Sequence, residues 1–299
     1  MTGLEKMKRN KLGLSVFLAA IIEFSIIGGY IYKTKHSKPD VEKTVEIYTV
    51  FHKPWKIYQN DIVIPIHAGR ALNTERAKPL LNKMIGDDTG DNISEKNQRY
   101  SELTALYWIW KNSKADYVGL MHYRRYFDLA PFVRYNPQCK DKLCSLGLEA
   151  DNIKKLMNDY DIIVTSYDLE MPQYNYYARW HFVENMDLAI DCIRKKHPSE
   201  AAVIDNVMMS KHFIAYNMFI AKKKIIDRYA AWIFKVLADL EDKLEYDHDK
   251  AYFGCVIPRH PTYQLRAPAY LAERLFNVWL EAHKNEYKIL EVPIQIIKI

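Results

Sequence analysis

The sequence has little glycine and proline, with 10 Gly and 12 Pro among 299 residues. Collagen-like, low-complexity and mainly disordered chains need far more of these residues, so those classes are excluded. The larger part of the chain also lacks an excess of positive charge, because residues 1–43 contribute four of the six net positive charges. A protein that binds nucleic acid concentrates basic residues on its folded domain, so no nucleic-acid partner is expected.

Several catalytic signatures are missing. The chain contains no G-x-x-x-x-G-K-S/T loop, no G-x-G-x-x-G, no G-x-S-x-G and no H-E-x-x-H. This disfavours P-loop enzymes, dinucleotide enzymes, α/β-hydrolases and zinc peptidases. The four cysteines form no Cys-x-x-Cys pair and no zinc spacing. They allow two disulfides in an oxidising compartment, and four buried thiols are the alternative.

Apolar and aromatic residues are plentiful. Hydrophobic residues make up 49% of the chain and aromatic residues 13%, with 22 Tyr. This length and apolar content suffice for one large domain or two small ones. Tyrosine and tryptophan combine a flat apolar face with a polar edge, which suits contact with sugar rings and equally suits an ordinary core.

A mostly apolar run spans residues 12–32. At about 1.5 Å per residue, a helix of this length crosses a hydrocarbon core of roughly 30 Å. Glu23 lies near its middle and opposes insertion, while the surrounding isoleucines favour it. A cleaved signal peptide is the alternative, but the run is long for one and no small-x-small site ends it. The sequence therefore predicts a retained signal-anchor and a single-pass membrane protein.

The chain is expected to divide into four segments, of which this run is the second. They are a short basic N-terminus at 1–11, a transmembrane anchor at 12–32, a polar stalk at 33–44 and a globular domain at 45–299. Four basic residues precede the apolar run and four follow it, so the positive-inside rule does not assign the domain to one side of the membrane.

The remaining sequence alternates between β-like and helix-like patterns. Strands are expected at 45–51, 61–66, 117–121, 161–165 and 214–221, with a loosely strand-like tail at 288–299. Helices are expected at 97–111, 153–158, 183–196, 199–210, 224–243 and 267–282. Interleaved strands and helices are typical of an α/β layered fold.

A basic segment, residues 122–127 (HYRRYF), directly follows the third expected strand. Ligands of open α/β sheets bind beyond the carboxyl ends of strands, and a guanidinium pairs bidentately with phosphate oxygens. The segment is therefore a candidate diphosphate site with the cations His122, Arg124 and Arg125. The alternative is a surface network in which the arginines pair with Asp116 or Asp128.

An acidic loop, residues 87–92 (DDTGDN), places three carboxylates and an amide close together. Such oxygens can hold a divalent metal or sugar hydroxyls. The alternative is an Asx-rich turn that caps the next helix, with Ser94 as the capping residue. Two Asp-x-Asp patterns, at 159–161 and 247–249, are further metal candidates. Neither follows an expected strand, and so short a pattern arises easily by chance.

Single carboxylates on two expected helices are candidate general bases. Glu102 lies on the face opposite the apolar stripe of its helix, and Glu273 immediately precedes Arg274. Each could instead be a surface charge or half of an ion pair. Asn217 is a polar residue inside an expected strand, where it could contact a ligand or be a satisfied core amide.

Five segments occur in a recognisable order: 92–94 (NIS), 101–112 (SELTALYWIWKN), 117–127 (YVGLMHYRRYF), 216–220 (YNMFI) and 271–280 (LAERLFNVWL). In this combination the chain resembles the family of capsular and exopolysaccharide biosynthesis proteins labelled a domain of unknown function and treated as glycosyltransferases. The resemblance extends from about residue 45 to residue 280. It implies a GT-A-like, Rossmann-like nucleotide-sugar domain with a helical C-terminal part.

The resemblance also implies a set of site residues. Where a GT-A enzyme carries its Asp-x-Asp, this chain has the basic segment 122–127. Mn²⁺ or Mg²⁺ is an expected cofactor, with Asp88 and Asp91 as candidate ligands, and metal-independent catalysis by the basic segment is the alternative. The residues expected to bind the nucleotide sugar and its diphosphate are His122, Tyr123, Arg124, Arg125, Asn92, Asn217 and Arg274.

The sequence thus predicts a membrane-anchored hexosyltransferase of surface polysaccharide or glycoconjugate synthesis. It would move a sugar from a nucleotide donor, expected to be UDP-linked, to a glycan or lipid-linked glycan. If the reaction inverts the anomeric centre, the candidate catalytic bases are Glu102, Asp88 and Glu273. One alternative is a non-catalytic glycan-binding module on a transferase fold, and another is a sugar-phosphate transferase of capsule assembly.

Overall fold

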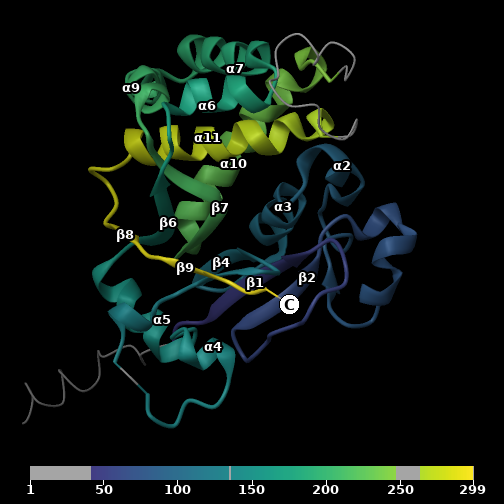
Figure 1. Cartoon of the computed structure of the whole chain (residues 1–299), viewed down its shortest axis with the longest axis vertical. Helices are drawn as coiled ribbons and strands as arrows, with labels where there is room; N and C mark the ends of the chain where they lie inside the picture. Colours follow the sequence, from purple (N-terminus) through teal and green to yellow (C-terminus); the bar gives the residue numbers. More distant parts are fainter. Residues whose placement is uncertain (1–41, 135, 247–262, 299) are drawn as a thin grey trace, which may run out of the picture. The chain divides into compact units, whose positions relative to one another are not determined.

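A mixed β-sheet forms the centre of the unit that spans Lys43–Ile299 (Figure 1). The computed structural model describes residues 42–134, 136–246 and 263–298, and in these ranges nine strands pair into the sheet. Its main path has the order β3-β2-β1-β4-β7-β6-β8, with β5 beside β4 and β9 beside β5. The strands are β1 (Val45–Phe51), β2 (Val63–His67), β3 (Ile85–Gly86), β4 (Tyr117–His122), β5 (Arg125–Phe127), β6 (Ile162–Asp168), β7 (His212–Lys222), β8 (Ile289–Glu291) and β9 (Ile294–Ile296).

Strand direction brings several strand ends to one edge of the sheet. β1 pairs in parallel with β2 and with β4, whereas β7 is antiparallel to both β4 and β6. The carboxyl ends of β1, β2, β4 and β6 therefore point the same way, and β7 begins at that edge. Edges of this kind are where open α/β sheets bind ligands.

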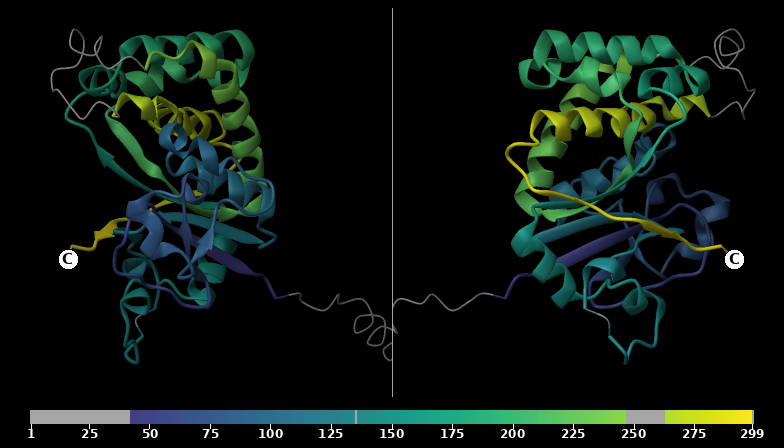
Figure 2. Two further views of the ribbon diagram at one scale, coloured as in Figure 1. Left: turned by 90° about the vertical axis from the view of Figure 1, so that its right-hand side faces the viewer. Right: turned by 60° about the vertical axis from the view of Figure 1, so that its left-hand side comes forward.

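Alternating side chains of the strands fill one core on each face of the sheet. Tyr48 and Val50 of β1 pack in the core beneath α3 (Leu103–Asn112), α10 (Lys223–Leu240) and α11 (Ala267–Ala282). Val45 and Ile47 of the same strand face the other core, beneath α4 (Lys142–Ser145) and α5 (Ala150–Asp159). Figures 1 and 2 show these two groups of helices on opposite sides of the sheet. The period of two along each strand thus separates the layers.

The remaining helices extend the layer that contains α11. They are α2 (Asn97–Tyr100), α6 (Gln173–Trp180), α7 (Val183–Lys196), α8 (Pro198–Ala201) and α9 (Ile204–Met209). The helices expected at 183–196 and 267–282 are confirmed with the bounds of α7 and α11. The expected α/β fold is also confirmed, with a mixed sheet.

Two helices expected to be continuous are interrupted. The one at 97–111 breaks at Ser101, whose φ of 48° and ψ of −125° lie outside helical space, and α3 starts only at Leu103. Side-chain contacts hold the break, because Asn97 Nδ2 donates to the Ser101 carbonyl at 2.7 Å. The helix expected at 199–210 is likewise divided into α8 and α9. Hydrophobic periodicity continues across both breaks, so the pattern does not reveal them.

The predicted membrane localisation is contradicted. In the described ranges, no helix combines the length and the apolar character that crossing a bilayer requires. Such a helix needs about 20 consecutive, mostly apolar residues. The longest described helix, α10, has 18 residues and carries Lys223, Asp227 and Arg228. The run at 12–32 lies outside the described residues, so the anchor predicted there has no support and is not retained.

One disulfide joins Cys139 to Cys144, and Cys192 is a free thiol. Cys255 lies outside the described residues. One disulfide with a free Cys192 matches neither of the two arrangements expected from the sequence, two disulfides or four buried thiols.

A buried aspartate joins the end of β2 to the start of α3. The Asp87 carboxylate is fully buried and accepts hydrogen bonds from the backbone N–H groups of Gly69 and Arg70, at 2.8 and 3.2 Å. It also accepts from the hydroxyls of Ser94 and Thr104. Four donors thus converge on one buried charge, which holds the acidic loop against the sheet.

We expect Asp87→Ala to lower the free energy of unfolding by about 3 kcal/mol, because four buried donors lose their acceptor. Asp88→Ala, at the neighbouring and partly exposed carboxylate, is the matched control and should change stability by less than about 0.5 kcal/mol. Urea unfolding followed by circular dichroism measures both. Equal losses in the two variants would contradict the role assigned to Asp87.

Candidate active site

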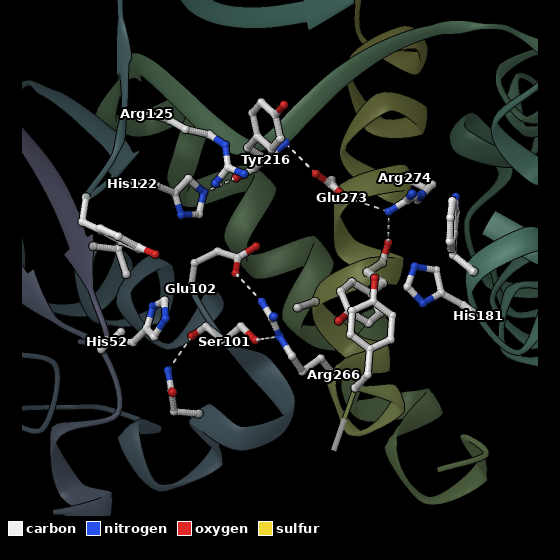
Figure 3. A pocket seen from close by; sticks show the side chains of 18 of the residues that line it. His52, Ser101, Glu102, His122, Arg125, His181, Tyr216, Arg266, Glu273 and Arg274 are labelled. Atoms are coloured by element: carbon white, nitrogen blue, oxygen red, sulfur yellow. Dashed lines mark hydrogen bonds and ion pairs between the residues drawn. The ribbon is translucent and has the colours of Figure 1, made fainter. Parts of the chain in front are cut away.

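A cavity of about 650 Å³ opens at the carboxyl ends of the parallel strands. Val50, Ala68 and His122 line it from the ends of β1, β2 and β4. The opposite wall is built by α11 and by the first half of β7. Figure 3 shows side chains from both walls pointing toward the space between them. The cavity therefore occupies the edge where the sheet order predicts a ligand.

The middle of β7 has an irregular backbone at this cavity. Tyr216 and Asn217 have φ angles of 68° and 52°, in the left-handed region. The register between β6 and β7 shifts at the same place, as in a β-bulge. Left-handed angles cost a non-glycine residue on the order of 1–3 kcal/mol, and they concentrate at functional sites. The bulge aims the Tyr216 N–H and carbonyl at two different cavity residues.

His122 is one of those residues (Figure 3). Its Nε2 lies 2.7 Å from the Tyr216 carbonyl, and a carbonyl only accepts, so Nε2 carries the hydrogen. Burial lowers the pKa of His122 below its usual value, and Arg125 also lowers it, although Glu102 and Glu273 oppose the shift. The ring is therefore neutral at pH 7, and the positive charge in this part of the cavity comes from arginines.

Four arginines and two glutamates line the described cavity, which is an excess of two positive charges when the histidines are not counted. Arg125 lies over the Tyr216 ring, with its guanidinium carbon 4.4 Å from the ring centroid. Arg124 lies over the Tyr123 ring at 5.7 Å. Within the described ranges neither Arg124 nor Arg125 forms an ion pair, so their charge is available to an anionic ligand.

The two glutamates differ in how fully their oxygens are used. Glu273 accepts the Tyr216 N–H at 2.6 Å through Oε1 and the Arg274 guanidinium at 2.7 Å through Oε2. Glu102 accepts one bond through Oε1, from Asn217 Nδ2 at 2.8 Å. Its Oε2 lies 4.0 Å from Arg266, beyond hydrogen-bond length. Glu102 Oε2 thus forms an ion pair with Arg266 but accepts no hydrogen bond from the described residues, so it remains able to accept a proton.

The far end of the cavity is aromatic. The His181 ring stacks on Tyr270, with centroids 4.0 Å apart, and on Tyr263 at 5.5 Å. Tyr176 and Trp180 line the same end. Flat rings with polar edges suit the apolar face of a sugar or a base, so the cavity combines a cationic part with an aromatic part.

The acidic loop lies apart from this cavity. Asp88 is 3.9 Å from Arg70, Asp91 accepts from the Tyr107 hydroxyl at 3.1 Å, and Asn92 donates to the Gly90 carbonyl at 3.0 Å. None of these residues lines the cavity. The alternative of a turn held by Asx contacts describes this loop better than a ligand site.

No candidate metal cluster is found in the part of the chain that the structure describes, where no three His, Cys, Asp or Glu side chains gather suitably. Asp161 pairs with Lys222 at 2.6 Å, just before β6 and so away from the cavity edge. The Asp-x-Asp at 247–249 lies outside the described residues.

Most of the site residues named from the sequence converge on the cavity. They are Glu102, His122, Tyr123, Arg124, Arg125, Glu273 and Arg274. Asn217 lies directly behind it, 2% exposed and bonded to Glu102. Sequence reasoning missed Ser101 and Arg266, which hydrogen-bond to each other at 2.7 Å. It also missed Tyr216 and the aromatic end, whose residues are ordinary core types in the sequence.

Comparison with known proteins gives one family and one solved structure. A family model described as a domain of unknown function (DUF4422) matches residues 46–285. The chain is also similar to the apo structure of a protein named WbbM bifunctional glycosyltransferase, with a TM-score of 0.72 and 29% sequence identity. That match covers 86% of this chain and 46% of the other, so this chain spans about half of its length. No curated protein matches.

We expect the melting temperature of the wild type to fall more between pH 7.5 and pH 5.5 than that of His122→Gln. The pKa of His122 is lower in the folded chain than its usual value of about 6.5. Below that value the unfolded chain takes up a proton that the folded chain does not, so stability present above it is lost as the pH falls. Glutamine keeps a donor for the Tyr216 carbonyl and does not titrate. Thermal unfolding at stepped pH measures the difference, and parallel curves would count against the buried neutral ring.

Proposed function

We propose that this chain, which belongs to the DUF4422 family, is a glycosyltransferase that moves a sugar from a nucleotide donor to a glycan hydroxyl. One observation carries the proposal. Two arginines without an ion pair to any described residue, a carboxylate oxygen without a hydrogen bond from one, and an aromatic wall meet in one cavity at the carboxyl edge of the sheet. Similarity to a bifunctional glycosyltransferase supports it. A UDP-linked hexose is the proposed donor, and a glycan or lipid-linked glycan the proposed acceptor.

The arginines would hold the leaving group. When the anomeric carbon–oxygen bond breaks, its electron pair goes to the diphosphate, and that negative charge needs stabilisation. Arg124 and Arg125 stand where the strands end and have no competing carboxylate among the described residues. Guanidinium groups pair bidentately with such oxygens.

Glu102 would act as the general base. The acceptor hydroxyl attacks the anomeric carbon and must lose its proton as the new carbon–oxygen bond forms. Glu102 Oε2 faces the cavity without a hydrogen-bond partner among the described residues, whereas both Glu273 oxygens are occupied. Glu273 is therefore better suited to holding Arg274 and the Tyr216 backbone than to accepting a proton.

The metal suggested by the GT-A resemblance does not fit the residues that the structure describes. The cavity offers one carboxylate with a free oxygen, and Asp88 and Asp91 lie elsewhere. We therefore route no step through a metal and assign charge stabilisation to the arginines. Addition of Mn²⁺ in the binding experiment below tests this assignment.

Thermal unfolding should show that a UDP-sugar stabilises the full chain, whereas the free sugar does not. A ligand at 100 times its dissociation constant raises the free energy of unfolding by about 2.7 kcal/mol. Arg125→Ala should weaken donor binding by about 10-fold or more, because a hydrogen bond to a charged group is lost. Arg194→Ala, at a surface arginine paired with Asp205, is the control and should bind as the wild type does. Failure of every UDP-, GDP- and CMP-sugar to stabilise the folded chain would overturn the donor assignment, and a shift that needs Mn²⁺ would overturn the metal-free one.

Glu102→Gln should lower kcat for donor turnover by about 100-fold or more, with the donor KM little changed, because a general base contributes on that scale. Glu273→Gln should instead lower stability by about 3 kcal/mol, because it leaves the buried Arg274 guanidinium without its counter-ion. Donor consumption with and without acceptor glycans gives the rates, and urea unfolding gives the stabilities. Full activity of Glu102→Gln would rule out Glu102 as the base.

A further inference from the structure

Asn217 makes one contact that the proposed chemistry depends on. The residue is 2% exposed and does not line the cavity, so it stands behind the wall. Its Nδ2 donates to Glu102 Oε1 at 2.8 Å. We propose that Asn217 is a positioning residue, which fixes the Glu102 carboxylate so that Oε2 faces the acceptor hydroxyl. The inference rests on the proposed role of Glu102 as general base.

The orientation of the amide follows from charge. An ionised carboxylate only accepts hydrogen bonds, so it attracts the NH₂ end of the amide and repels the oxygen end. The bond to Oε1 occupies one carboxylate oxygen and leaves Oε2 to accept the proton of the acceptor hydroxyl. It also restricts rotation of the Glu102 side chain, whose free rotation would spread Oε2 over several positions. A base must lie within hydrogen-bond reach of the proton it removes.

The other end of the amide argues against a purely structural role. Asn217 Oδ1 is buried and has no hydrogen-bond partner among the described residues. A core amide retained only for packing normally has partners for both of its ends, because an unsatisfied buried acceptor is destabilising. Here the unpartnered Oδ1 lowers the stability of the folded chain, while Nδ2 donates to Glu102. Such local costs are typical of functional sites.

Hydrogen bonds of the neighbouring Tyr216 hold the backbone next to Asn217. The Tyr216 N–H donates to Glu273, and its carbonyl, which belongs to the peptide group entering Asn217, accepts from His122 (Figure 3). Asn217 itself has a φ of 52°. Asparagine tolerates this left-handed conformation better than most residues. One residue type therefore supplies both the required backbone and an amide donor.

The identity of residue 217 can be changed without changing its backbone conformation. Asn217→Gly keeps the left-handed angle available and removes the side chain with its amide. Asn82→Gly is the matched control, because Asn82 is also left-handed, with a φ of 66°, and lies outside the cavity. It should leave donor turnover unchanged. We expect Asn217→Gly to lower kcat by about 10-fold or more, with donor KM and donor binding within about twofold of the wild type, because a misplaced catalytic group costs rate rather than affinity.

Asn217→Asp tests the charge at the same position. It replaces the donated N–H with a second carboxylate beside Glu102, and two adjacent carboxylates disfavour simultaneous ionisation. The acid limb of the kcat profile should move to higher pH by about one unit or more. A residue that has no contact with the catalytic base would not displace this limb. Full chains of all variants are compared by donor consumption from pH 5 to pH 9.

The possible results separate the two levels of the proposal. If Asn217→Gly keeps its kcat and Asn217→Asp keeps the wild-type profile while Glu102→Gln is inactive, the positioning role is overturned and the transferase stands. If Glu102→Gln stays active, the base assignment and this inference both fail, although donor binding can still hold. A large rise in donor KM in Asn217→Gly would also contradict positioning and would return Asn217 to donor binding.

Discussion

In the middle of β7, two adjacent residues have left-handed backbone angles, and three titratable residues of the cavity hydrogen-bond to them. Tyr216 binds His122 through its carbonyl and Glu273 through its N–H, and Asn217 binds Glu102 through its side chain. A regular strand would direct these groups into sheet pairing. At the bulge these groups do not pair with a neighbouring strand and instead bond to residues of β4 and α11 and to the N-cap of α3. The left-handed angles make this arrangement locally unfavourable in backbone energy.

This arrangement gives two similar carboxylates different roles. Glu273 is neutralised by Arg274 and bonded to the bulge, so it acts as part of the wall. Glu102 is bonded once and keeps a free oxygen. The lowered pKa of His122 follows the same logic, because burial beside Arg125 disfavours another positive charge. Arg124 and Arg125, which form no ion pair with the described residues, therefore supply positive charge to the cavity. Glu102 supplies a carboxylate oxygen that no described residue hydrogen-bonds.

Local patterns predicted much of the framework and part of the site. Strand β1 and helices α7 and α11 have the bounds that periodicity indicates, because each buries one regular face. The position of His122 to Arg125 after a buried strand also placed them at the ligand edge. The sequence did not predict helix α6, the break at Ser101 or the position of the acidic loop outside the cavity. Each depends on contacts with residues distant in sequence, as when Asp87 gathers donors from Gly69 to Thr104.

The sequence by itself determined which side chains the fold contains and on which face of each strand or helix they lie, since side-chain periodicity is a local property of the backbone. It also carried the family resemblance, with its order of motifs. Only the tertiary structure decided that Glu102 Oε2 accepts no hydrogen bond from the described residues, that both Glu273 oxygens are occupied and that Asn217 lies behind the cavity wall. Those distinctions depend on which donors reach a given oxygen, and the donors come from residues as much as 115 positions away.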